Sequence, residues 1–153
     1  MALIHEAVGE VVFDSKDVFS PGDNVVMIPN TPFGEDEFRA NYSKRSKFRG
    51  SGFDGFTSDL VCLKHDRLVK LPLNFDLEVS AFIELMTVAY QGIMKFKEFK
   101  KASCNVLGVW GDGNLGYITA LFLKQLCPES KIIVFGKHIE NLNLFSFADE
   151  TYL

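Results

Sequence analysis

Three glycines near residue 111 form the pattern with the most specific chemistry in this sequence. Gly111, Gly113 and Gly116 have the G-x-G-x-x-G spacing, with Asn114 and Leu115 between the last two. In such a turn the first glycine allows a tight bend, the second lets the backbone approach a pyrophosphate, and the third lets the following helix pack closely. The positive end of that helix then faces the phosphates. The spacing therefore predicts that all five residues bind a dinucleotide cofactor.

The residues that follow the next apolar run distinguish NAD from NADP. Domains that bind NAD usually place Asp or Glu about 20 residues beyond the glycine turn, against the ribose 2′-hydroxyl. This sequence has Gly136 there, followed by Lys137 and His138. Since no carboxylate repels a 2′-phosphate and a lysine attracts one, the pattern favours NADP(H), with Lys137 as a cofactor-binding residue. The alternative is that Lys137 is a solvated charge at the end of a strand.

The sequence around the glycines alternates between strand and helix patterns. An apolar run at 105–110 leads into the turn, apolar residues at helical spacing follow between 118 and 126, and a β-branched run occupies 131–136. Strand, glycine turn, helix and strand in this order predict a β-α-β unit of a parallel sheet. A glycine pattern by itself also occurs in ordinary turns, and the surrounding order favours the nucleotide-binding interpretation.

The chain before residue 80 has a β-rich pattern instead. A Pro-Gly turn at 21–22 separates two apolar runs, which predicts a hairpin of a small β-barrel. Further short strands are expected at Thr57–Leu63 and Leu68–Leu71, and helices at Asp76–Glu84 and Thr87–Phe96. We therefore expect an α/β protein with a β-rich part, and a domain boundary near Phe96 to Ser103.

Composition and charge exclude several other classes of protein. The 153 residues are 47% hydrophobic, which is enough for a core, and the net charge of −4 argues against a nucleic-acid partner. Neither a signal peptide nor an apolar run of membrane-spanning length is expected, so the prediction is a cytoplasmic protein without a membrane partner. Cys62, Cys104 and Cys127 form no metal motif, and we expect reduced, mostly buried thiols.

Several short motifs occur in one order along the chain. They are His5-Glu6 with Gly9, Pro21-Gly22-Asp23, Asp54-Gly55, Leu71-Pro72, Ile83-Glu84-Leu85 and the glycine turn. This order resembles the zinc-dependent medium-chain dehydrogenase/reductases, the alcohol and polyol dehydrogenases. The resemblance implies a partial GroES-like catalytic domain with connecting helices at 1–96, followed at 97–153 by the first half of a Rossmann fold, a doubly wound parallel sheet.

Four longer runs are most similar to one branch of that superfamily, the bacterial NADPH-dependent ribulose-5-phosphate reductases. They are Met27–Asn30, Ser51–Phe56, Trp110–Gly116 and Leu144–Ala148. Those enzymes make ribitol 5-phosphate for teichoic-acid or capsule precursors. The resemblance implies an oxidoreductase that transfers hydride from NADP(H) to the ketone of a sugar phosphate.

The resemblance also implies a zinc site. His5 matches a zinc ligand of the family, and Glu84 matches the acidic ligand of its polyol branch, a donor set that suits a zinc ion that polarises a carbonyl. Adjacent strand residues point to opposite faces, so Glu6 can join His5 on one ion only if the backbone bends. Glu6 is therefore expected to be a catalytic residue. It is either a zinc ligand in some states or a hydrogen-bonding partner of the zinc ligands. The alternative for His5 is a hydrogen-bonded structural histidine.

Two departures from the family pattern qualify these expectations. The segment 30–49 contains no cysteine, so the second, structural zinc of many alcohol dehydrogenases is not expected. The family also places a cysteine ligand well upstream of the His-Glu pair, so the chain resembles the central part of an enzyme. We expect weak zinc binding and incomplete catalysis by this chain alone, and a homo-oligomer or another association through an exposed sheet edge.

Other functions compatible with parts of the pattern are a nucleotide-binding or interaction remnant without catalysis, a methyltransferase, and a zinc-free quinone reductase. Gly136-Lys137 speaks against the methyltransferase, which needs an acidic residue there, and the joint presence of His5 and Glu84 speaks against the quinone reductase. The basic run Lys44–Arg49 is either a substrate-phosphate contact or, as charge runs usually are, a solvated loop. His65-Asp66-Arg67 is expected to be a turn with a local ion pair.

Overall fold

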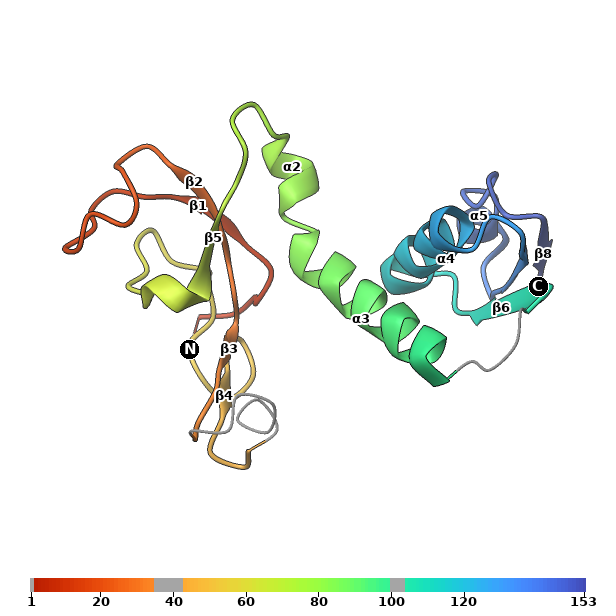
Figure 1. Cartoon of the computed structure of the whole chain (residues 1–153), viewed down its shortest axis with the longest axis horizontal. Helices are drawn as coiled ribbons and strands as arrows, with labels where there is room; N and C mark the ends of the chain where they lie inside the picture. The colour runs from red at the N-terminus through yellow and green to blue at the C-terminus, as the bar shows by residue number, and fades with distance from the viewer. Residues whose placement is uncertain (1, 35–42, 100–103) are drawn as a thin grey trace. The chain divides into compact units, whose positions relative to one another are not determined.

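The computed structural model describes residues 2–34, 43–99 and 104–153. Its contacts divide the chain into two compact units, which we call unit 1 (Met1–Glu84) and unit 2 (Leu85–Leu153). Figure 1 shows the elements of both in chain order. The division falls at the start of a long helix, and the domain boundary expected near residue 96 stays a prediction.

Unit 1 consists of short antiparallel strands and short helical turns. Its elements are β1 (Val8–Glu10), β2 (Asn24–Met27), β3 (Asn30–Thr31), β4 (Lys47–Phe48), the 3-10 helix η1 (His65–Arg67), β5 (Leu68–Lys70) and α2 (Leu77–Ser80). One sheet has the order β1-β2-β5, and β3 pairs with β4 in a second. The predicted hairpin is confirmed, because β1 and β2 are antiparallel neighbours with Val8 opposite Val26.

The predicted strand at Thr57–Leu63 is wrong. Within the described part of the chain this segment belongs to no strand, and its backbone hydrogen bonds are few: the Thr57 N–H donates to the carbonyl of Leu3, and the Ser58 N–H to that of Phe56. Leu60 is 73% exposed. The four consecutive apolar residues at 60–63 do not form one buried face, and so they do not specify a partner strand.

The helices near residue 80 differ from the prediction in their bounds. Asp76 caps α2 by accepting a hydrogen bond from the Val79 N–H at 3.0 Å, but the helix ends after Ser80. The next helix, α3, covers Ile83–Phe99. Glu84 therefore lies in the first turn of α3, and the expectation that it ends the preceding helix is wrong.

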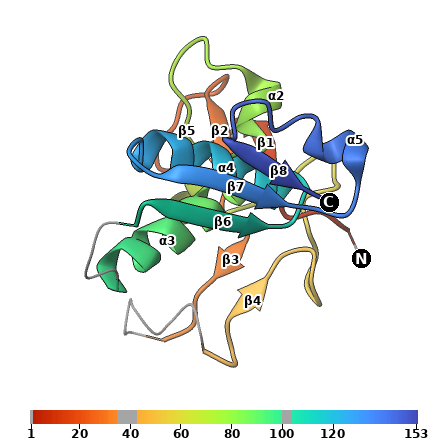
Figure 2. The ribbon, with the colours of Figure 1, turned by 90° about the vertical axis from the view of Figure 1, so that its right-hand side faces the viewer.

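Unit 2 is a three-stranded parallel sheet with helices. After α3 its elements are β6 (Val106–Trp110), α4 (Asn114–Leu126), β7 (Lys131–Phe135), α5 (Ile139–Leu142) and β8 (Glu150–Tyr152). Figure 2 shows β6, β7 and β8 side by side, in that order. The predicted β-α-β unit is confirmed, with Val109 of β6 in register with Val134 of β7.

The core of unit 2 lies between the sheet and α4. Ala120, Ile132 and Val134 are fully buried, and each of the two larger side chains contributes about 1.5–3 kcal/mol by leaving water. Phe145 is 2% exposed, and Phe147 packs against the same cluster. This core fixes the ends of β6 and β7, where the predicted cofactor residues lie.

No helix among the described residues is long and apolar enough to cross a membrane. The three cysteines are free thiols: Cys62 is exposed, and Cys104 and Cys127 are partly buried. The expectation of mostly buried thiols is therefore wrong. Cys62 is exposed because its segment, predicted to be a strand, runs without strand partners.

Candidate functional site

The glycine turn joins β6 to α4 with the geometry that its spacing predicts. Gly111 has a φ of 135°, a conformation that favours glycine, and its N–H donates to the carbonyl of Phe135 at 2.8 Å. A Cβ on Gly116 would lie 2.0 Å from the carbonyl oxygen of Gly111, whereas a Cβ on Gly113 would meet nothing within 4 Å. Gly116 is thus required for the packing of the turn, and Gly113 leaves open space on its outer side.

The N-terminus of α4 has the properties of an anion site. Its N-cap is Gly113, which makes no side-chain capping hydrogen bond, and the helix runs for 13 residues from Asn114. The first N–H groups of a helix lack partners within the helix, and they carry the positive end of its dipole. Together with the open side of Gly113, this arrangement fits a pyrophosphate group.

The structure brings Lys137 close to this turn. Both Lys137 and His138 donate their backbone N–H to the carboxylate oxygen Oδ2 of Asp112, at 2.8 and 2.7 Å. Asp112 lies between the first two glycines of the turn, and these hydrogen bonds hold its pKa below the usual range. Sequence reasoning missed Asp112 as a contributor to the site, although an acidic side chain inside a glycine turn was a visible signal.

His5, Glu6 and Glu84 come together in unit 1. Each offers one potential ligand atom, and these atoms all lie within 4.8 Å of one another. The His5 Nε2 to Glu6 Oε1 distance is 3.7 Å. The bend that would let adjacent residues approach one ion is present: the backbone bends at His5, and Ile4 has a φ of 64°. We call these three residues the metal-ligand cluster.

Close backbone packing holds the His5 side of the cluster. The N–H groups of Gly55 and Phe56 donate to the carbonyls of Ala2 and Ile4, both at 2.9 Å. A Cβ on Gly55 would lie 2.2 Å from the Ile4 carbonyl oxygen, so only glycine allows this approach. The His5 ring also packs against Phe48 with 5.1 Å between ring centroids.

Charge and burial in the metal-ligand cluster favour a cation. Burial raises the pKa of Glu84, the nearby charge of Glu6 raises it further, and His5 lowers it. Two carboxylates that share a half-buried site repel each other, and a bound cation offsets that repulsion. One imidazole nitrogen and two carboxylate oxygens are a donor set that zinc accepts, with a fourth position left for substrate or water.

The other charged segments have local partners. Arg45 lies over the ring of Phe33, and Lys47 and Arg49 lie over the ring of Phe53, at 4.9 to 5.0 Å from the ring centroids. Whether this basic run contacts a substrate phosphate stays a prediction.

The local ion pair expected in His65-Asp66-Arg67 is confirmed by an Arg67 to Asp66 distance of 3.1 Å. His65 pairs instead with Asp14, its Nε2 lying 2.6 Å from Oδ1.

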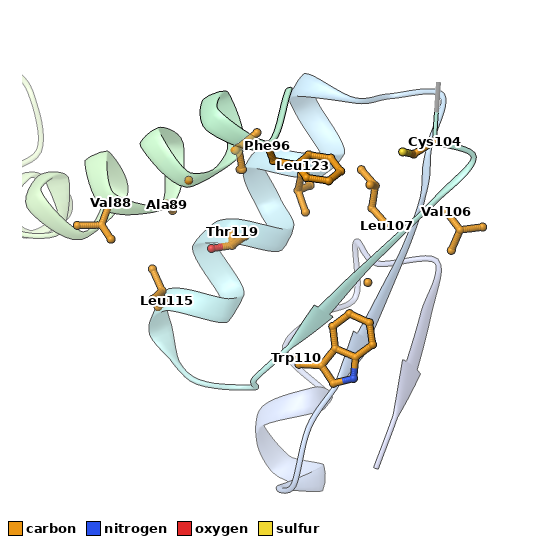
Figure 3. Close-up of a pocket in the computed structure, with 13 residues that line it drawn as sticks. Val88, Ala89, Phe96, Cys104, Val106, Leu107, Trp110, Leu115, Thr119 and Leu123 are labelled. Atoms are coloured by element: carbon orange, nitrogen blue, oxygen red, sulfur yellow. The ribbon is translucent and has the colours of Figure 1, made fainter. Parts of the chain in front are cut away.

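An apolar groove of about 550 Å³ lies in unit 2 between α3, β6 and α4. Figure 3 shows Phe96, Trp110, Leu115 and Leu123 among its lining side chains. Within the described part of this unit, the lining does not include the three glycines of the turn or Lys137. Of the predicted cofactor-binding residues, only Leu115 lines the groove.

Comparisons with known proteins find relatives that are named reductases or dehydrogenases. No protein-family profile matches the chain. Ribulose-5-phosphate reductase 1 of Staphylococcus aureus is 54% identical over 153 residues, which cover 99% of this chain and 45% of that protein. Ribulose-5-phosphate reductase of Bacillus spizizenii is 47% identical with the same coverage. The chain is homologous to ribulose-5-phosphate reductases. It spans about 45% of the length of these curated relatives.

Solved structures confirm the fold. S. aureus TarJ in complex with NADPH is 48% identical, with a TM-score of 0.79, over 99% of this chain and 41% of that one. Galactitol-1-phosphate dehydrogenase from Escherichia coli is 26% identical, with a TM-score of 0.85, over 99% of this chain and 45% of that one. The predicted resemblance to zinc-type dehydrogenases, with a partial GroES-like part and a partial Rossmann fold, is therefore confirmed.

Proposed function

We propose that this chain supplies the nucleotide turn and the metal-ligand cluster of a zinc-dependent, NADP(H)-dependent reductase that converts ribulose 5-phosphate to ribitol 5-phosphate. The observation that carries the proposal is the convergence of His5, Glu6 and Glu84, distant in sequence, within 4.8 Å. Proteins named ribulose-5-phosphate reductase match 99% of the chain, and one solved relative contains NADPH.

The metal-ligand cluster would hold one zinc ion. When bound, zinc acts as a Lewis acid toward the ketone oxygen of the substrate. His5 contributes a neutral nitrogen, and the carboxylates of Glu6 and Glu84 contribute the charge that balances the cation. Phe48, against the His5 ring, limits the orientations that the imidazole adopts.

The residues of unit 2 would bind and orient the cofactor, which supplies the hydride. The open side of Gly113 and the first turn of α4 would receive the pyrophosphate, and Lys137 would face the ribose 2′-phosphate. No carboxylate occupies position 136, where NAD-binding domains usually carry one. Binding at this turn fixes the cofactor by its phosphates, away from the carbon that donates hydride.

We also propose that the chain associates with a second copy of itself through the outer edge of β6. In the described sheet β6 is an edge strand, and its residues Val106 and Trp110 are 53% and 77% exposed. An unpaired strand edge beside an apolar groove is a template for association. Light scattering coupled to gel filtration should show a mass above 17.2 kDa, and a strictly monomeric chain would contradict this.

The experiment that tests the proposed function measures two bindings and one activity on the purified 153-residue chain. NADPH fluorescence should report nucleotide binding, and competition with a chromophoric chelator should report zinc binding that depends on His5 and Glu84. Ribulose 5-phosphate should be the preferred substrate of any ketone reduction. Binding of NADPH with no zinc binding would support a nucleotide-binding module without catalysis, and absence of both bindings would refute the proposal.

A further inference from the structure

The carboxylate of Asp112 is the anchor of the segment that follows β7. One oxygen, Oδ2, accepts hydrogen bonds from the N–H groups of Lys137 and His138 and lies 3.1 Å from the His138 Nδ1. The Asp112 side chain is only 11% exposed, while that of His138 is 57% exposed. All of these donors come from two consecutive residues, so one side chain fixes their backbone.

Gly136 makes this contact possible. A Cβ at position 136 would lie 2.7 Å from the Cβ of Asp112 and 2.8 Å from its Oδ2. An aspartate or glutamate at position 136, as NAD-binding domains use, would therefore begin in space that Asp112 already occupies. Because the same Cβ would also lie 2.7 Å from the Cδ2 of Leu142, any side chain at position 136 would require Asp112 and Leu142 to move.

The hydrogen bonds of Asp112 begin where the pairing of the sheet ends. The Gly136 N–H still donates to the carbonyl of Tyr152 at 2.9 Å, as a continuation of the β7 and β8 pairing. The next two N–H groups, those of Lys137 and His138, turn to Asp112 instead. Removal of the Asp112 carboxylate would leave the N–H groups of these two residues without this partner, while β7 stays paired and the His138 carbonyl still accepts from the Leu142 N–H at 3.0 Å.

We propose that Asp112 is a positioning residue for recognition of the ribose 2′-phosphate, which it achieves by fixing the backbone from which Lys137 and His138 project. This inference rests on the proposed NADP(H) function. The Asp112 carboxylate keeps its charge, and its Oδ2 is engaged by the two backbone N–H groups of the loop. A fixed loop lowers the conformational entropy that Lys137 loses when the phosphate binds.

The test compares two nucleotides that differ only in the 2′-phosphate. Adenosine 2′,5′-bisphosphate and adenosine 5′-monophosphate are titrated calorimetrically into the 153-residue chain, and the ratio of their dissociation constants measures 2′-phosphate recognition. The variants are D112A, which removes the anchor, and D112N, whose amide oxygen still accepts N–H hydrogen bonds without the charge. E129A, at an exposed glutamate in the turn before β7, is the matched control for loss of an acidic side chain.

The wild-type chain and E129A should prefer the bisphosphate by the same ratio. D112A should lower that ratio at least about fivefold while its affinity for the monophosphate stays within about twofold, and D112N should retain most of the preference. A purely structural role would weaken both nucleotides alike and leave the ratio unchanged, and that result would overturn the inference. A wild-type chain without any preference for the bisphosphate would overturn the NADP(H) assignment as well, so the two failures are distinguishable.

Discussion

The two units hold their candidate sites in different ways. In unit 2 the predicted cofactor residues follow one another within a single β-α-β segment, above a core with fully buried Ala120, Ile132 and Val134. In unit 1 the metal-ligand cluster joins a loop near the N-terminus to the first turn of α3, on a scaffold of strands no longer than four residues. The nucleotide turn depends on local sequence, and the cluster depends on tertiary contacts.

This difference has an energetic consequence. The turn needs a few backbone conformations that glycine adopts without strain, and the buried sheet beneath it supplies its rigidity. The metal-ligand cluster depends on several tertiary contacts that must form together, among them the close contact of Gly55 with the Ile4 backbone. Substitutions that disturb local packing should therefore weaken zinc binding by the cluster in small steps. They should weaken nucleotide binding by the turn only at a few positions.

The largest expected effect is at Gly116. In Gly116→Ala the new Cβ would meet the Gly111 carbonyl, so the turn must move, and NADPH affinity should fall by at least about tenfold, or about 1.4 kcal/mol, with a lower Tm. Gly113→Ala is the matched control, since its Cβ meets no protein atom within 4 Å. Gly113→Ala should keep the wild-type Tm. It should lose NADPH affinity only because its Cβ meets the bound nucleotide. Equal Tm values for the wild type, Gly116→Ala and Gly113→Ala would contradict the assignment of Gly116 to the packing of the turn and of Gly113 to contact with the ligand.

The second effect concerns the ligands of the cluster. Glu84→Gln removes an anionic donor, and zinc affinity should fall by about tenfold, the lower end of the range that loss of a ligand's supporting partner typically costs. NADPH affinity should not change, because Glu84 is not among the residues predicted to bind the cofactor. Chelator competition and NADPH fluorescence on the same sample check both statements. Unchanged zinc affinity in Glu84→Gln would mean that Glu84 is not a zinc ligand.

A smaller effect is expected from the packing beneath His5. Gly55→Ala would push the Leu3–Ile4 backbone away and should weaken zinc binding by about threefold to tenfold, since the ligands remain but their geometry loosens. Gly92→Ala in α3 is the control, because its Cβ meets nothing within 4 Å and alanine favours a helix by about 0.5–1 kcal/mol. Zinc affinity in the control should equal that of the wild type. A weaker metal site in Gly92→Ala would contradict the local origin of the effect.

The smallest effect is a dependence of stability on pH. Burial raises the pKa of Glu84 in the folded state, so the folded form favours the protonated carboxyl. Without metal, its contribution to stability is full below the ordinary glutamate pKa and is lost as pH rises through the raised value.

Thermal unfolding of the metal-free chain from about pH 4 to about pH 8 measures this contribution as the difference between wild type and Glu84→Gln. The variant should gain stability relative to the wild type as pH rises, and Glu78→Gln on α2 should not. Parallel curves for all three proteins would mean that Glu84 is not penalised by burial.

The sequence predicts unit 2 well because its signals are local. Periodicity locates β6, α4 and β7, and glycine spacing locates the turn between them. The role of Asp112 could not be predicted, because a polar residue in a turn is not part of a periodic pattern. Its hydrogen-bond partners also lie on a segment that only the parallel pairing of β6 with β7 brings near. The same pairing explains why Lys137 could be chosen from its position at the end of β7.

Unit 1 was less predictable because its strands are short and its contacts distant. The apolar run at the end of Thr57–Leu63 predicts a strand, but the segment contacts the chain near Leu3 through a few hydrogen bonds only. Glu84 was placed at a helix end because the break between α2 and α3 has no proline or glycine to mark it. The metal-ligand cluster itself came from the resemblance to a family, since no spacing rule joins His5 to Glu84.

The most direct test of the account is the relative affinity of the 153-residue chain for NADPH and NADH, measured by fluorescence titration under one set of conditions. NADPH should bind at least about tenfold more tightly than NADH, a difference of about 1.4 kcal/mol, and Lys137→Ala should remove most of that difference. Equal affinities for the two nucleotides, or no binding of either, would contradict it.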